Sequence, residues 1–164
     1  MQKKIIIYQD QIAQVGGVET HLYNFCVNLY EYYDILVLYG TDHGKTIQRL
    51  RTYVKAEKYD EKKKYECDIC IRNSLYWKIP ENIQAKKYYE MLHADYEWLS
   101  DKTKVNQWEK AEKIGCGEFV AKQYEKVYGT KVKWIRNILA PTIEPQKVYH
   151  FISCTRLGPE KRLG

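Results

Sequence analysis

The first forty residues contain the pattern that most constrains the fold, a strand followed by a helix and a second strand. Lys3–Gln9 and Ile35–Tyr39 are short apolar runs typical of buried strands, and Gly40 closes the second. Between them, apolar residues recur at steps of three and four, which predicts a helix of roughly four turns from Val18. Two strands joined by a helix in so short a stretch pair in parallel, so we expect an α/β fold with a parallel sheet flanked by helices.

The rest of the chain continues this alternation. We expect further strands at Cys67–Asn73, Lys86–His93, Lys113–Cys116 and Lys131–Asn137. A second helix follows Gly117 and ends at Gly129, because a glycine commonly stands just past the end of a helix. The lysine-rich segment 44–64 has a weaker pattern, which fits a short helix at residues 45–52 and a short strand near Tyr53.

Composition excludes several classes of protein. With 45% hydrophobic and 29% charged residues, the chain of 164 residues can bury a core and is not disordered. No window approaches the ~18 uninterrupted apolar residues of a membrane-spanning helix. The basic start MQKKIIIYQDQ lacks the long apolar region and the cleavage site of a secretion signal. We therefore expect a cytoplasmic protein.

The five cysteines are irregularly spaced, which argues against a disulfide scaffold. Cys26 falls on the apolar face of the first predicted helix, as a reduced, buried thiol would. Cys67 and Cys70 form a CxxC pattern, but no second CxxC or histidine pair completes a zinc site. Because side chains alternate along a strand, we expect these two cysteines on opposite faces, and we expect no bound metal.

The net charge of +6 comes mainly from lysines that are interspersed with acids, as in residues 55–66. Such a run is usually a solvated surface, and the alternative is attraction to an anionic membrane or to a phosphate-bearing substrate. The 16 tyrosines, some beside lysines, would suit stacking on nucleic-acid bases. Acidic residues interrupt these runs, so we expect no nucleic-acid partner.

Candidate binding residues flank the first helix and end a later strand. Gly16 and Gly17 precede the helix, where a backbone without side chains can approach an anion and the helix N-terminus offers free N–H groups; a plain turn is the alternative. Glu19 in the first turn either faces a ligand or only favours the helix dipole. His93 ends a predicted strand, where open parallel sheets bind ligands, although a histidine satisfied at a strand end is the alternative. We assign no chemistry to His21.

The order of these features resembles that of the retaining glycosyltransferases of family four. The shared features are a GGxE loop before an amphipathic helix, a histidine that closes a mid-domain strand, and a proline-containing linker into FISCTRLGPEK. The resemblance implies the GT-B architecture, in which two Rossmann-like domains face each other across a cleft. It divides the chain into an N-terminal, acceptor-side domain at 1–140, a linker at 141–147, and the first strand and loop of a donor-binding domain at 148–164.

The resemblance also implies roles for individual residues. Gly16 and Gly17 would meet the donor diphosphate or the acceptor, and His93 would be the catalytic residue near the donor sugar. Arg156 and Lys161 match the basic pair that stabilises the departing diphosphate. In this chain Thr155 and Arg162 replace the glycines that usually adjoin that pair, and Glu19 is the candidate on the acceptor side.

Together these roles predict the transfer of a sugar, with retention, from a nucleotide-sugar donor to a sugar, lipid-linked or protein acceptor. We expect no cofactor and no essential metal, and a bacterial cell-envelope or exopolysaccharide pathway at the inner face of the membrane. The chain would hold little of the donor domain, so we expect these 164 residues to be inactive alone.

Two other functions are compatible with the pattern. One is a non-catalytic Rossmann-like domain that binds a nucleotide or a protein. The other is an NAD-linked dehydrogenase, which is disfavoured because GxGxxG is missing and Asp34 opens the second strand, whereas that fingerprint requires an acid at its end.

Overall fold

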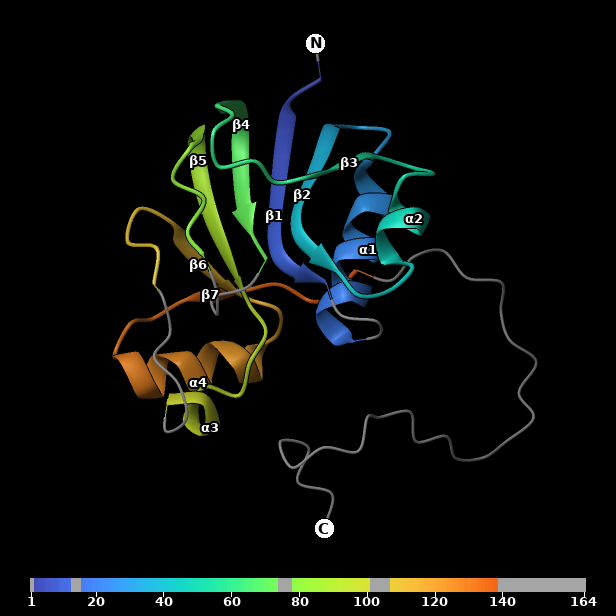
Figure 1. The fold of residues 1–164 in the computed structure, drawn as a ribbon. Helices are drawn as coiled ribbons and strands as arrows, with labels where there is room; N and C mark the ends of the chain where they lie inside the picture. Colours follow the sequence, from blue (N-terminus) through green and yellow to red (C-terminus); the bar gives the residue numbers. More distant parts are fainter. Residues whose placement is uncertain (1, 13–15, 74–77, 101–106, 139–164) are drawn as a thin grey trace, which may run out of the picture.

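The computed structural model describes residues 2–12, 16–73, 78–100 and 107–138, which form a parallel seven-stranded sheet flanked by helices (Figure 1). The strands are β1 (Lys4–Ile12), β2 (Asp34–Asp42), β3 (Lys55–Lys58), β4 (Tyr65–Arg72), β5 (Ile83–Leu92), β6 (Glu112–Gly115) and β7 (Lys133–Trp134). The helices are α1 (Gly17–Leu29), α2 (Thr46–Leu50), α3 (Tyr96–Ser100) and α4 (Glu118–Tyr128). The expected α/β fold is confirmed.

The strand order is β3-β2-β1-β4-β5-β6-β7. The chain builds outward from β1 to β3, and then returns to place β4 on the other side of β1. This is the order of a Rossmann-like sheet, and the reversal makes the carboxyl ends of β1 and β4 a topological switch point. Open α/β sheets bind their ligands at such a point, so the fold itself marks where a site is expected.

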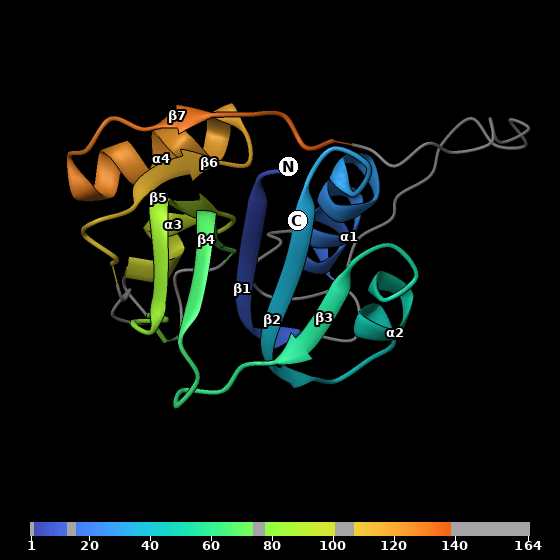
Figure 2. The same cartoon turned by 90° about the horizontal axis from the view of Figure 1, so that it is seen from above.

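The two faces of the sheet bury different cores. Ile5 and Ile7 of β1 pack with Leu22 of α1 in one core, whereas Ile6 and Tyr8 point to the opposite face and pack in another. Figure 2 shows α1 and α2 together on one side of the sheet, away from α3 and α4. A third core joins α3 and α4 to the end of β5; it contains Leu92, Tyr96, Leu99 and Tyr124. Each large apolar side chain that is fully buried in this way contributes about 1.5–3 kcal/mol.

The first two strands run further than their apolar runs predict. β1 extends to Ile12 and β2 extends through Gly40 to Asp42, with Ile12 opposite Asp42 in the parallel register. A side chain on residue 40 would clash, because its Cβ would lie 2.6 Å from the main-chain oxygen of Asp10. Gly40 therefore lets the two strands stay close at their ends, and the prediction that it closes the second strand is wrong.

Three short elements also differ from the prediction. Tyr53 lies in the turn that follows α2, where its N–H donates to the Leu50 carbonyl oxygen over 2.9 Å, and the strand forms later, in β3. The predicted strand at 131–137 is only the two residues of β7, and α3 has no counterpart in the prediction. The second helix is confirmed as α4, which Gly129 ends in the left-handed conformation at φ 68°.

The two cysteines of the CxxC pattern do not lie on opposite faces of the sheet. Cys70 is buried in the core that contains Tyr8, and Cys67 packs against the same core. Tyr65 and Cys67 face this core from the first part of β4 and Cys70 faces it from the second part, so the strict alternation of β4 is interrupted between the two cysteines. The register with β5 keeps the same offset across this point, from Cys67–Ala85 to Ile69–Lys87. That expectation is therefore wrong. The four cysteines within the described residues are all free thiols.

Candidate functional site at the carboxyl ends of three strands

Three polar side chains meet where β1, β4 and β5 end. Gln9 lies near the end of β1, Asn73 directly follows β4, and His93 directly follows β5. These strands are neighbours in the sheet, so their ends lie side by side. Asn73 Nδ2 donates to Gln9 Oε1 over 2.7 Å, and His93 Nε2 lies 3.0 Å from Asn73 Oδ1.

Helix α1 adds a carboxylate to this chain of contacts. Gln9 Nε2 donates to Glu19 Oε1 and to the Gln11 carbonyl oxygen, each over 3.1 Å. We call Glu19, Gln9, Asn73 and His93 the polar network. Gln9 and Asn73 are almost completely buried, at 2% and 1% exposure, while His93 is half-buried.

His21 packs against the histidine of the polar network. The two imidazole rings lie 4.8 Å apart between centroids at an angle of 67°. His21 is buried, and its Nδ1 has no hydrogen-bond partner among the described residues. A cavity of about 10 Å³ lies beside it, lined by His21, Asn73 and apolar side chains, which is barely enough space for one water molecule.

Burial keeps both histidines neutral. It lowers the pKa of His93 to about 3, and the neighbouring His21 lowers it further. Burial also lowers the pKa of His21, and the Asn73 side chain offsets part of that change. Because the charged imidazolium is disfavoured in both cases, the site presents two uncharged rings near neutral pH.

The two glycines before α1 differ in their surroundings. Gly16 has an extended backbone, and a Cβ placed there would lie 2.3 Å from Glu19 Oε2. Gly16 thus lies directly against the polar network. Gly17 begins the helix, and a Cβ there would meet nothing within 4 Å among the described residues. The structure therefore brings Gly16, Glu19 and His93 together, with Gly17 beside them at the start of the helix.

The remaining predicted residues lie outside the part of the chain that the structure describes. Arg156 and Lys161 belong to this group, as do the predicted linker at 141–147 and the strand and loop at 148–164. Within the described part, no group of three or more histidine, cysteine or acidic side chains could hold a metal ion. No described helix has the length and apolarity needed to cross a membrane.

Sequence reasoning missed Gln9, Asn73 and His21. A usable signal existed for the first two, because each is a polar residue at the end of an apolar strand, as His93 is. Parallel strands bring such residues to the same edge of a sheet. His21 stands four residues before Phe25, and their rings lie 6.1 Å apart, so it extends the buried stripe of α1.

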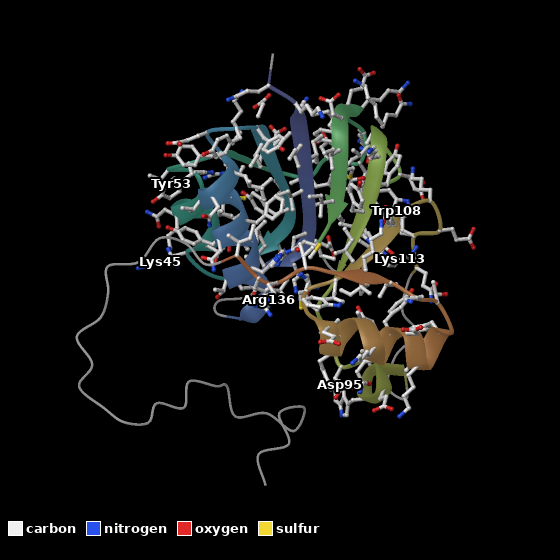
Figure 3. All side chains as sticks on the ribbon, turned by 180° about the vertical axis from the view of Figure 1, so that it is seen from behind. Lys45, Tyr53, Asp95, Trp108, Lys113 and Arg136 are labelled. Carbon is white, nitrogen blue, oxygen red and sulfur yellow. The ribbon has the colours of Figure 1, made fainter. Side chains whose placement is uncertain are left out.

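A second buried polar cluster lies on the other face of the sheet and supports the same strands. Glu90 of β5 pairs with Arg72 of β4, and its other oxygen lies 3.4 Å from Lys113 Nζ of β6. Lys113 also donates to the Trp108 carbonyl oxygen over 2.6 Å, and Figure 3 shows both residues beside the β4–β5 half of the sheet. Burial raises the pKa of Glu90, while the Arg72 and Lys113 cations counteract part of that rise. The cluster ties together three strands whose ends lie at or beside the candidate site.

The arrangement can bind a ligand through hydrogen bonds rather than through fixed positive charge. The polar network offers amide, carboxylate and neutral imidazole groups, and the first N–H groups of α1 lie next to it. Comparison with protein-family models, curated proteins and solved structures found no match to this chain.

Proposed function

We propose that this chain is the acceptor-side domain of a retaining, nucleotide-sugar-dependent glycosyltransferase of the GT-B type. One observation carries the proposal. Gly16, Glu19 and His93, which the motif pattern singles out, converge at the carboxyl edge of a Rossmann-like sheet, at its switch point. They are joined through Gln9 and Asn73 although the motifs are far apart in the sequence.

The start of α1 suits the donor diphosphate. No side-chain hydrogen bond caps this helix among the described residues, so its first N–H groups and the positive end of its dipole are available to an anion. Gly17 leaves open space at that point. In the proposed enzyme Arg156 and Lys161 supply the positive charge that stabilises the departing diphosphate.

The neutral state of His93 suits the sugar. In a retaining transfer the sugar becomes oxocarbenium-like, and a positively charged histidine beside it would oppose that change. The lowered pKa of His93 removes this repulsion and leaves a ring that can hydrogen-bond to the sugar. His93 is therefore the catalytic residue of the proposal, and Glu19 lies on the acceptor side.

The surface suits an acceptor at a membrane. Lysines of the segment 55–66 are exposed, including Lys55, Lys58 and residues 62–64. Exposed lysines attract anionic lipid headgroups, which would bring the enzyme to a lipid-linked acceptor at the inner face of the membrane. No cofactor and no essential metal take part in the proposed transfer.

The test is transfer by the protein that carries this chain, assayed with a panel of nucleotide sugars. His93→Ala should lower kcat by about a hundredfold or more, because it removes a group that contacts the reacting sugar. The matched control is His43→Ala, since His43 is an exposed histidine just after β2 and should be dispensable.

Two outcomes decide the matter. Full activity of His93→Ala would contradict the catalytic assignment. Binding of a nucleotide sugar with no transfer to any acceptor would instead favour a non-catalytic nucleotide-binding domain. The 164-residue chain by itself is expected not to transfer, and tight binding of a nucleotide sugar by this chain alone would also favour the non-catalytic alternative.

A further inference from the structure

We infer that Gln9 and Asn73 are positioning residues that fix the tautomer of His93, with the proton on Nε2 and the Nδ1 lone pair left as a hydrogen-bond acceptor. The inference follows from the direction of each hydrogen bond in the polar network. It assigns a chemical preference to the site, namely for a ligand group that donates a hydrogen bond.

The orientation of the Gln9 amide is determined first. Its Nε2 lies 3.1 Å from Glu19 Oε1 and 3.1 Å from the Gln11 carbonyl oxygen. A main-chain carbonyl oxygen only accepts hydrogen bonds, and so does an ionised carboxylate. The nitrogen of the Gln9 amide must therefore face these two groups, which turns its Oε1 toward Asn73.

The orientation of the Asn73 amide follows from that of Gln9. Because Gln9 Oε1 is an acceptor, the atom 2.7 Å away must be the Asn73 nitrogen, which donates to it. Asn73 Oδ1 then points to His93, 3.0 Å from Nε2. An amide oxygen carries no hydrogen, so the proton of this bond belongs to His93 Nε2.

A neutral imidazole has one N–H, so a proton on Nε2 leaves Nδ1 as the acceptor. Burial keeps His93 neutral by lowering its pKa to about 3. The His21 ring, packed 4.8 Å away between centroids, restricts the rotation of the His93 ring. Each hydrogen bond thus fixes the direction of the next. Glu19 and the Gln11 carbonyl oxygen orient Gln9, Gln9 orients Asn73, and Asn73 fixes the proton of His93.

This polarity selects the chemistry of the ligand. A hydroxyl group can donate to Nδ1, whereas an ionised phosphate can only accept and would face a lone pair. A ligand group that contacts His93 Nδ1 must therefore donate a hydrogen bond, as a hydroxyl does, and the anionic part of a ligand must bind elsewhere. The statement that this hydroxyl belongs to a sugar rests on the proposed function. The tautomer of His93 does not depend on it.

The experiment is long-range ¹H–¹⁵N NMR on the labelled full chain, which distinguishes the protonated from the unprotonated ring nitrogen. His93 should show Nε2 protonated in the wild-type chain. In Gln9→Leu the Asn73 nitrogen loses the acceptor that fixes its orientation, so His93 should become a mixture of both tautomers. Gln84→Leu is the matched control, since Gln84 is exposed near the amino end of β5 whereas His93 follows the carboxyl end, so His93 should be unaltered.

A proton on Nδ1 in the wild-type chain would overturn the inference, and so would a single, unchanged tautomer in Gln9→Leu. If that variant does not fold, Asn73→Asp gives a second reading. Its carboxylate should keep the proton on Nε2 and raise the pKa of His93, because an opposite charge stabilises imidazolium. An unchanged pKa in this variant would contradict the contact from which the argument starts.

Ligand preference is measured on the same signals. Adding a methyl glycoside should shift Nδ1 of His93, and adding inorganic phosphate should not. A shift with phosphate but not with the glycoside would overturn the ligand class. These readouts do not depend on transfer, so a protein that transfers no sugar but shows the expected tautomer would refute only the proposed function.

Discussion

Replacing Glu90 with glutamine should be among the most damaging conservative changes in this chain. Glu90 is fully buried and lies between the buried Arg72 guanidinium and Lys113 Nζ. Removing one member of a buried ion pair leaves an uncompensated charge, which costs about 3–5 kcal/mol. A domain of ordinary stability has only about 5–15 kcal/mol. With a urea m-value near 2 kcal/mol per molar, the midpoint of unfolding should fall by about 1.5–2.5 M.

Glu57→Gln is the control, because it makes the same change in an ion pair on the surface. Glu57 lies 2.9 Å from Lys63, and both side chains are about half exposed. Solvent screens such pairs, so the urea midpoint should stay where it is. Replacing both buried partners, as in Arg72→Met with Glu90→Leu, should be less harmful than Glu90→Gln because the pair's charges are removed together. A urea midpoint that hardly moves in Glu90→Gln would refute the reasoning. It would mean that the buried Arg72 and Lys113 cations do not need the Glu90 carboxylate to compensate their charge.

Three further changes test other features of the structure. The pKa of His93 is about 3 in the fold against an ordinary 6.5, so the unfolded chain binds more protons between these values. The free energy of unfolding should therefore fall on acidification from pH 6.5 toward 3, and it should fall less steeply with pH in the His93→Gln variant. Equal pH dependences of the two free energies, measured by denaturant titration, would contradict this. Gly40→Ala should lose about 1–3 kcal/mol, because its Cβ would meet the Asp10 main chain, whereas Gly17→Ala has open space and should lose nothing in the same urea assay. Gly129→Ala should cost about 1 kcal/mol, because φ is 68° there, and an unchanged melting temperature would argue against the left-handed cap.

The parallel sheet was predictable because its central elements carry their own periodicity. The apolar run of β1, the stripe of α1 and the run of β2 each indicate one kind of element. The ends of β1 and β2 were not predictable, since residues 10–12 are polar or isolated apolar residues that become strand only by pairing with β2. In the sequence, Gly40 predicts the end of the strand. In the fold, its missing side chain leaves room for the Asp10 main chain, and only the folded structure brings Asp10 close to it.

Short elements depend most on packing, which the sequence pattern does not contain. α3 has only five residues, too few for a helical period, and Tyr96 in it is buried by a ring contact with Tyr124 of α4, 5.0 Å away between centroids. β7 pairs only through Lys133 and Trp134, because the chain that follows has no further register with β6 within the described residues. Both elements exist because a neighbour is present.

Half of the candidate site could be predicted from position alone. Glu19 at a helix start and His93 at a strand end stand where ligands commonly bind. Gln9 and Asn73 could be found only from the strand order. Nothing in the local sequence indicates that β4 pairs with the edge of β1 opposite to β2. Asn73 is 64 residues from Gln9 in the chain and 2.7 Å from it in the fold.

The same strand order sets when the site can form during synthesis. β4 must find β1 after β2 and β3 have already been made, and β5 must follow before His93 can meet Asn73. Closing so long a loop is slow compared with forming α1, whose contacts are local. At about 5–20 residues per second, a ribosome exposes α1 and its glycines several seconds before the histidine. The nascent chain therefore first contains only the α1 half of the site. The half that contains Asn73 and His93 joins it only when β4 and β5 have been added to the sheet.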